Sequence, residues 1–439
     1  MSVPDDDSTS KDSHAHPRDL RVFVFGLFFT FGGITSLNDI IIPKLRALFT
    51  LTHAEAMLVQ SAFFAAYFIV SLPAAEVVTR VGYMRTAVLG LVTMTLGCLL
   101  FVPASGSGLY AMFLLALFVL ASGITIVQVV ANPLISLLGD PATAHSRLTF
   151  AQAFNSLGTT LFPYVGSILI LGSLASVDPT VLSGAALQSF RSAETRVIEH
   201  AYLGLAVALL FIAGLVWVRR KRFVEATADA TNLLAAFKLL RRPRFGFGTW
   251  CIFLYVGAEV SIGSLLVNYL MQANVMGLGA EQAGKHVPLY WGGAMVGRFV
   301  GAYFLRVFSP GKVLACVAGA AILLLMTSGN TTGPASGWCL LAVGLCNSIM
   351  FPTIFSLASE DLGRHAAEGS GIICMAIVGG AIVPWLTGHI ADGSTLKAAL
   401  SIPAYCYAFI VAFGLFARRP ARREPEHSSR NAARGRSGP

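Results

Sequence analysis

In this chain of 439 residues, apolar residues make up 55% and charged residues only 12%, whereas soluble globular proteins carry about 25% charged residues. This composition excludes an ordinary soluble protein and favours one that faces a lipid bilayer. The formal net charge of +9 does not indicate nucleic acid, because the basic residues lie between apolar runs and form no continuous face.

The chain begins with a polar segment, residues 1–19, which lacks the apolar region of a cleaved signal peptide. Twelve apolar stretches follow, each long enough to cross a bilayer as a helix of about twenty residues. The sequence therefore predicts an all-α membrane protein. The stretches lie near residues 20–42, 57–79, 86–103, 109–138, 147–172, 198–218, 246–272, 287–308, 312–329, 336–358, 367–390 and 396–417.

One long polar break, residues 219–245, separates residues 20–218 from residues 246–417. We expect each of these parts to fold as a bundle of six helices, with the break as a loop between them. The last segment, residues 418–439, is rich in Arg, Ser, Gly and Pro and carries too little apolar surface to pack, which predicts disorder.

The distribution of Lys and Arg predicts the orientation in the membrane. If the N-terminus is cytoplasmic, 24 of these residues lie on the cytoplasmic side and six on the other side. Positively charged residues gather on the cytoplasmic side of membrane proteins. We therefore expect a multi-pass protein of the cell inner (plasma) membrane with both termini in the cytoplasm.

The two halves carry related patterns. Pro133 in the fourth span corresponds to Pro352 in the tenth at an offset of 219, and Pro163 in the fifth corresponds to Pro384 in the eleventh at an offset of 221. Matches at nearly one offset indicate that a six-helix unit has been duplicated.

Two carboxylates within predicted spans stand out, because an ionised group inside the membrane costs a few kcal/mol and tends to mark the path of an ion or substrate. Asp39 lies in the first span and Glu259 in the seventh, the first span of the second half. We predict that both take part in ion coupling. The alternatives are an interfacial position for Asp39 near Pro43 and a structural pair of Glu259 with Arg298.

Amide side chains also gather in the spans. Gln128 and Asn132 are four residues apart, and Gln152 and Asn155 are three apart, so each pair shares a helix face. Because an amide both donates and accepts hydrogen bonds, such groups suit a ligand with many hydroxyls, although bonding between helices without a ligand is the alternative. The predicted substrate-binding residues are Asn38, Gln128, Asn132, Gln152, Asn155, Glu259, Asn268, Trp291 and Asn347.

Signatures of catalysis are absent from the sequence, which contains no HExxH, P-loop or Gly-x-Ser-x-Gly motif and no cluster of histidines at metal-ligand spacing. We therefore predict no enzyme, no catalytic residue, no metal and no cofactor.

Several motifs resemble the fucose:proton symporter family of the major facilitator superfamily. They occupy residues 37–43, 60–64, 131–133, 151–156 and 352–357. Residues 255–264, 290–293 and 346–352 are similar to the bacterial glucose/galactose branch of that family.

The resemblance implies two bundles that rock about a central site, so that the site opens to one side at a time. It further implies that Asp39 carries the coupling proton and that Gln152 and Asn155 line the sugar cavity. Gln128 stands where fucose symporters hold a glutamate, and Glu259 stands where they hold a glutamine. Because an amide cannot titrate, this exchange favours a different sugar and leaves the identity of the ion open.

We therefore predict a secondary active transporter, acting as a monomer, that imports a hexose of the glucose/galactose type with a proton. Burial favours the protonated form of Asp39, which would bind a proton from outside and release it inside. Coupling to sodium and transport of fucose, mannose, fructose or N-acetylglucosamine are alternatives. A membrane-embedded sugar sensor and a drug exporter are alternatives from other functional classes.

Overall fold

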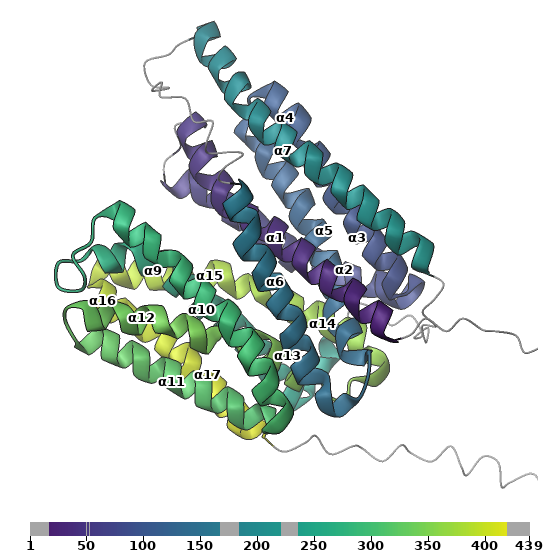
Figure 1. Ribbon diagram of the computed structural model, residues 1–439, viewed down its shortest axis with the longest axis vertical. Coiled ribbons are helices and arrows are strands. Elements are labelled where there is room, and N and C mark those ends of the chain that lie inside the picture. The colour runs from purple at the N-terminus through teal and green to yellow at the C-terminus, as the bar shows by residue number, and fades with distance from the viewer. Residues whose placement is uncertain (1–16, 50, 52, 167–183, 221–235, 419–439) are drawn as a thin grey trace, which may run out of the picture.

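The computed structural model describes residues 17–49, 51, 53–166, 184–220 and 236–418. Some side chains inside these ranges, those of Asn38 and Asp39 among them, lie outside the description. Every regular element in these ranges is a helix, and the helices form the two predicted groups (Figure 1). The all-α prediction is therefore confirmed.

The first half contains α1 (Pro17–Phe49), α2 (His53–Val81), α3 (Tyr83–Leu99), α4 (Phe101–Ser107), α5 (Tyr110–Leu137), η1 (Pro141–Thr143), α6 (Ala144–Gly166) and α7 (Gly184–Arg219). The second half contains η5 (Phe237–Arg241), α9 (Pro243–Met271), α10 (Ala280–Val307), α11 (Pro310–Asn330), α12 (Pro334–Asn347), α13 (Met350–Ala358), η6 (Gly363–His365), α14 (Ala366–Met375), η7 (Ala376–Val378), α15 (Gly379–Gly393), α16 (Leu396–Ala399) and α17 (Ser401–Phe416).

These helices give the twelve predicted spans. The third span is divided into α3 and α4, the tenth into α12 and α13, the eleventh into α14, η7 and α15, and the twelfth into α16 and α17. The predicted central loop falls between α7 and α9, and its residues 221–235 lie outside the description. We call the end at which α1 begins and α17 ends the tail end, and the opposite end the far end.

Among the described residues, nine helical stretches are long and apolar enough to cross a membrane. Neither α6 nor α10 is among them, and α1 has only a shorter apolar run, Arg21–Leu37. Both α1 and α10 pack against α6. The less apolar α6 therefore packs against the two other less apolar helices, and its contact with α10 joins the two halves.

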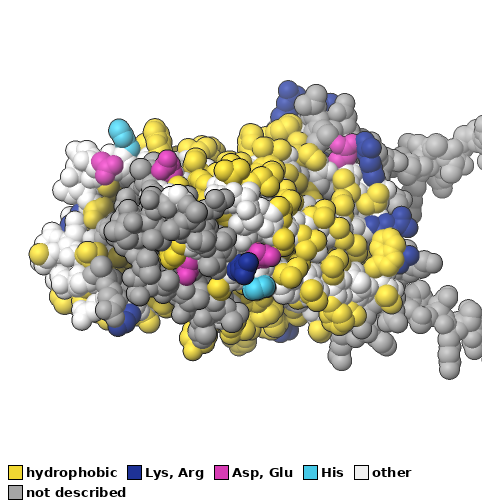
Figure 2. All heavy atoms as spheres, turned by 90° about the horizontal axis from the view of Figure 1, so that it is seen from above, with side chains coloured by type: hydrophobic (Ala, Val, Ile, Leu, Met, Phe, Trp, Pro, Cys, Tyr) yellow, Lys and Arg dark blue, Asp and Glu magenta, His cyan; other side chains and the backbone are white. Residues whose placement is uncertain are grey.

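The face drawn in Figure 2 is broadly apolar, with charged side chains toward its two ends and one group of basic, acidic and histidine side chains near its middle. Large apolar side chains are exposed on helices of both halves, including Val207, Phe211, Tyr303, Leu323 and Trp385. Soluble monomers rarely expose apolar patches of this extent. This surface is suited to contact with lipid.

Equivalent arginines make equivalent hydrogen bonds in the two halves. Arg21, near the start of α1, donates from Nε to the backbone oxygen of Leu138 at 2.9 Å. Arg244, near the start of α9, donates from Nε to the backbone oxygen of Leu357, also at 2.9 Å. The last backbone oxygens of a helix have no donor within that helix. Each arginine thus binds one such oxygen at the end of the fourth span of its own half.

The halves meet toward the tail end. Ser146 at the start of α6 donates to the backbone oxygen of Ala302 at 2.7 Å. His145 Nε2 lies 3.1 Å from Glu360 Oε1, and Arg244 pairs with the same carboxylate. In Figure 1 the halves approach at the lower right, where α6 packs on α13 and α14 packs on α2, and they diverge toward the upper left. These contacts join the halves at the tail end.

Small residues allow α10 and α12 to pack closely. Gly293, Gly297 and Gly301 recur every fourth residue on α10, and a Cβ at Gly297 would lie 2.5 Å from Ser348 Oγ. On α12, a Cβ at Gly344 would lie 2.1 Å from the backbone oxygen of Tyr290. Close approach through small residues is a common way for membrane helices to associate.

We expect Gly344→Ala to lower the thermal stability of the purified protein, because the added methyl group collides with a backbone atom that cannot rotate away. Overpacking of this kind costs roughly 1–3 kcal/mol. The measurement is the melting temperature in detergent. Gly292→Ala is the matched control, since a Cβ there meets no atom within 4 Å; equal melting temperatures for the two variants would contradict the packing described above.

Candidate functional site

Glu259 lies half-buried in α9, where Tyr255 precedes it by one helical turn. The hydroxyl of Tyr255 lies 2.7 Å from Glu259 Oε1 and 3.1 Å from the backbone oxygen of Asn347, so it can donate to either. The phenol therefore holds the carboxylate beside the end of α12.

Asn347 is fully buried and connects three helices. Its Nδ2 donates to Tyr290 Oη on α10 at 2.8 Å, and its Oδ1 accepts from Tyr407 Oη on α17 at 2.7 Å. We call Tyr255, Glu259, Tyr290, Asn347 and Tyr407 the tyrosine cluster. In this conformation both ends of the Asn347 amide serve tyrosines, so Asn347 positions the phenols, and the predicted direct contact with substrate stays a prediction.

Trp291 adds a flat apolar surface next to the tyrosine cluster. A Cβ at Gly263, one turn beyond Glu259 on α9, would lie 3.2 Å from Trp291 Cζ2. The indole is 41% exposed, and its ring centroid is 5.1 Å from that of Tyr290. A partly exposed aromatic ring one helical turn along from a carboxylate is an arrangement that can bind a ring with one apolar face and several hydroxyls.

The structure does not bring Asn268 to this group. Asn268 is exposed, and at about 100° per residue it lies on the side of α9 opposite to Glu259. Its predicted contact with substrate therefore lacks support from the arrangement of the described residues.

In the first half, three predicted amides are buried together. Gln152 Nε2 donates to Asn132 Oδ1 at 3.5 Å, and the exposed fractions of Gln128, Asn132 and Gln152 are 9%, 0% and 4%. In the described structure Asn132 also interacts with the Cys374 side chain, whereas Gln128 Oε1 makes no hydrogen bond. Buried polar atoms are normally paired, so Gln128 Oε1 is available to a ligand, to water or to another conformation of the protein.

Asn155 is half-buried and faces α1. Its Nδ2 donates to the backbone oxygen of Phe28 at 3.4 Å, and a Cβ at Gly32 would lie 2.4 Å from the same nitrogen. Asn38 and Asp39 belong to α1, the helix that α6 packs against, but their side chains lie outside the described residues. The predicted roles of Asn38 and Asp39 therefore stay predictions.

Arg298 lies between the tyrosine cluster and the first half. Its guanidinium interacts electrostatically with Glu259, the partner considered from the sequence. Its recorded hydrogen bonds, however, go elsewhere: Nε donates to the backbone oxygen of Ser348 at 3.0 Å, and Nη1 donates to Ser156 Oγ. The two serines were not predicted as site residues.

The three tyrosines were not predicted as site residues either, although one signal in the sequence was available. Tyr255 stands four residues before Glu259, a spacing at which helical side chains meet. Tyr290 lies in the segment 290–293 that resembles the glucose/galactose branch, but its contact with Asn347, like that of Tyr407, joins helices far apart in the chain and could not be read from the sequence.

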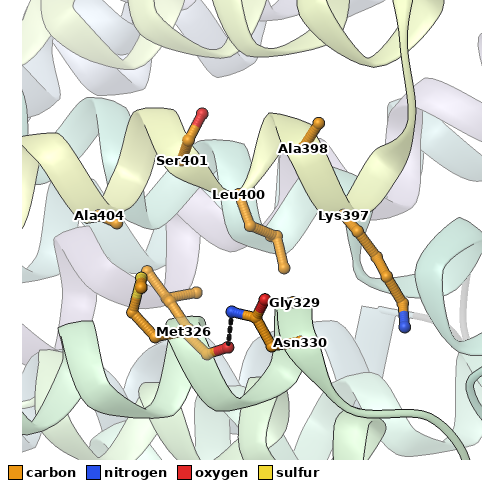
Figure 3. A pocket seen from close by; sticks show the side chains of 9 residues that line it. Met326, Gly329, Asn330, Lys397, Ala398, Leu400, Ser401 and Ala404 are labelled. Atoms are coloured by element: carbon orange, nitrogen blue, oxygen red, sulfur yellow. Dashed lines mark hydrogen bonds between the residues drawn. The ribbon is translucent and has the colours of Figure 1, made fainter.

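A groove at the far end of the second half lies apart from this group (Figure 3). It runs between α11 and the α16–α17 segment, and Asn330 in it donates to the backbone oxygen of Met326 at 2.8 Å. The ammonium of Lys397 donates to the backbone oxygen of Thr331 at 2.6 Å. None of the predicted site residues lines the groove, so we do not assign it to the substrate.

Comparison with known proteins gives consistent results. Residues 23–384 match the Major Facilitator Superfamily. The chain is 48% identical over 389 residues to the glucose/galactose transporter of Brucella abortus biovar 1 (strain 9-941), covering 89% of this chain and 92% of the relative. It is 32% identical over 407 residues to the L-fucose-proton symporter of Escherichia coli (strain K12), covering 90% and 92%.

Among solved structures, the crystal structure of the transporter FucP in the outward conformation is similar, with a TM-score of 0.83 and 30% sequence identity. The match covers 92% of this chain and 99% of that one. The expected fold, with two six-helix bundles, is therefore confirmed.

Proposed function

Because the chain belongs to the major facilitator superfamily, and within it to the family of the L-fucose-proton symporter and the bacterial glucose/galactose transporters, we propose that it imports a hexose by secondary active transport. The observation that carries this proposal is the Glu259 carboxylate, held by Tyr255 one helical turn from Gly263, against which the partly exposed Trp291 packs. A carboxylate accepts hydrogen bonds from sugar hydroxyls, and an indole ring covers the apolar face of a pyranose.

Glucose and galactose are the sugars that we propose as substrates. The relative with 48% identity bears the name of a glucose/galactose transporter. In the first half, the buried amides of Gln128 and Asn132 can each accept and donate hydrogen bonds, and Gln128 Oε1 has no partner among the described residues. Together with Glu259 they match the mixed hydrogen bonding of a hexose, and residues from both halves would surround it at a central site.

Coupling to a proton is the mechanism that we propose for accumulation. The related L-fucose-proton symporter bears the proton in its name, and Asp39 is the first-half carboxylate that would bind and release it. Glu259 is the second carboxylate, close enough to interact with Arg298. Since Gln128 cannot titrate, Asp39 and Glu259 are the two groups on which coupling to either a proton or sodium would depend.

We further propose that the tail end lies in the cytoplasm and that the protein acts as a monomer in the cell inner membrane. The excess of Lys and Arg on that side supports this orientation. With the tail end in the cytoplasm, the contacts of Ser146 and Glu360 between the halves close the cytoplasmic side. The described conformation would then be outward-facing.

The test is uptake by the purified protein in liposomes. We expect radiolabelled glucose to exchange against internal glucose, and an inward proton gradient to drive accumulation that an uncoupler abolishes with or without sodium. Competition by galactose, fucose, mannose, fructose and N-acetylglucosamine then ranks the substrates. Absence of exchange for every hexose would overturn transport and favour a sensor, whereas accumulation that requires sodium and resists the uncoupler would replace the proton.

A further inference from the structure

Two prolines at equivalent positions each leave a backbone oxygen without its helical donor. In an α-helix the N–H of one residue donates to the oxygen four residues earlier, and proline has no N–H. Pro133 lies inside α5, so the oxygen of Val129 lacks this donor. In α13 the backbone N–H of Thr353 donates to the backbone oxygen of Ile349 at 3.0 Å, as in a regular helix. The backbone oxygen one residue earlier, that of Ser348, has no such donor because residue 352 is proline.

Side chains supply both missing donors. Ser370 on α14 of the second half donates from Oγ to the Val129 oxygen at 2.9 Å, across the boundary between the halves. Arg298 on α10 donates from Nε to the Ser348 oxygen at 3.0 Å, and its Nη1 donates to Ser156 Oγ on α6 of the first half. The side chains of Ser156, Ser348 and Ser370 are buried, so water does not replace these bonds.

We propose that these two proline-freed oxygens are the anchor points of a pair of latches that hold the halves together in the described conformation. The Ser370 latch joins α14 directly to α5. The Arg298 latch is indirect, because the Ser348 oxygen fixes the guanidinium so that it reaches Ser156. Arg298 and Ser370 are thus positioning residues, and the inference deepens the proposed transport function by assigning what must break when the tail end opens.

The geometry explains why an arginine suits the second latch. A guanidinium presents several N–H groups in a fixed plane, so it can hold one acceptor in its own half and a second acceptor in the other half. The close approach of α10 to Ser348, made possible by Gly297, places the guanidinium at this position. Its interaction with Glu259 links the latch to the tyrosine cluster. A change in the charge of Glu259 therefore alters the electrostatic environment of Arg298, which joins the halves.

The test measures the separation of the halves at the tail end without requiring transport. Spin labels are placed at Arg85→Cys on α3 and Lys312→Cys on α11, both exposed, in a full-length chain whose native cysteines are replaced. Double electron–electron resonance in lipid nanodiscs then gives the distribution of distances. We expect Ser156→Ala to raise the ratio of long to short distances about tenfold, as for a lost hydrogen bond to a charged group, and Ser370→Ala to raise it about threefold.

Matched variants separate a latch from general loosening. Ser156→Thr keeps a hydroxyl acceptor and should restore the distances of the parent chain. Arg298→Lys keeps the charge but has a single nitrogen in place of the two that bind Ser348 and Ser156, so it should resemble Ser156→Ala. Ser122→Ala on α5 removes a hydroxyl that bonds within its own helix, to Phe118 at 2.7 Å, and should change nothing.

Unchanged distances in both Ser156→Ala and Ser370→Ala would overturn the proposal, and so would an equal shift in Ser122→Ala. Exchange of glucose by the parent chain in liposomes tests the proposed function separately. A parent chain that does not exchange glucose, but whose Ser156→Ala variant opens, would refute the function and keep the latches.

Discussion

Replacing Asp39 with asparagine is expected to abolish the accumulation of hexose against its gradient while exchange of labelled for unlabelled sugar stays measurable. The amide is nearly the same size as the carboxyl group and keeps its oxygen, but it cannot bind and release a proton. Without that step, the inward movement of sugar is no longer tied to the proton gradient. The measurement is the ratio of internal to external labelled glucose under an imposed proton gradient, compared with exchange at equal pH.

The control is Asp140→Asn, the same substitution at an exposed residue, where Oδ1 accepts from the backbone N–H of Ala142 at 2.9 Å. Asparagine keeps that bond and caps a helix as well as aspartate does. Accumulation in the Asp140 variant should equal that of the parent chain. Uphill accumulation by the Asp39 variant at the parent level would remove Asp39 from the coupling mechanism and leave Glu259 as the remaining predicted coupling residue.

Replacing Glu259 with alanine is expected to raise the KM for glucose about tenfold to a hundredfold. This range corresponds to losing a hydrogen bond to a charged acceptor, worth roughly 1.5–3 kcal/mol, at about 1.4 kcal/mol per factor of ten. Glu259→Gln should raise KM less, because its amide oxygen can still accept from Tyr255 and from a sugar hydroxyl. Initial rates of exchange over a range of glucose concentrations give the KM of each variant.

Glu76→Ala is the control for Glu259→Ala, since Glu76 pairs with Arg80 near the tail end and lies away from the tyrosine cluster. Its KM should not change. If Glu259→Ala leaves KM unchanged while Asp39→Asn abolishes accumulation, Glu259 does not touch the sugar. Loss of accumulation in Glu259→Gln with a normal KM would instead assign it to ion coupling.

Some of the predicted site residues meet one another in the structure, and others do not. Gln152 and Asn132 were predicted from their helix faces, and the structure places them in contact. Asn347 was predicted to bind substrate, yet both ends of its amide serve Tyr290 and Tyr407. Asn268 lies on the far side of α9 from Glu259. Amides within predicted spans thus indicated correctly that the interior is polar. They did not indicate which of them faces a ligand.

Four features could be predicted from the order of residues alone: the class of protein, the twelve spans, the duplication and the carboxylates within spans. Each of these depends on local quantities, namely the free energy of transferring one segment into lipid and the order of residues along it. The equivalence of Pro133 and Pro352 was also visible in this way, at an offset of 219.

The contacts that these features make became visible only once the helices were packed together. The donors that replace the missing proline N–H groups come from α14 and α10, and Ser370 is 241 residues from the oxygen that it binds. Such contacts depend on the rotation and crossing of helices from different halves, and the hydropathy of a single span carries no information about either. The meeting of Arg298 with Ser156 across the halves therefore had to be found in the packed structure.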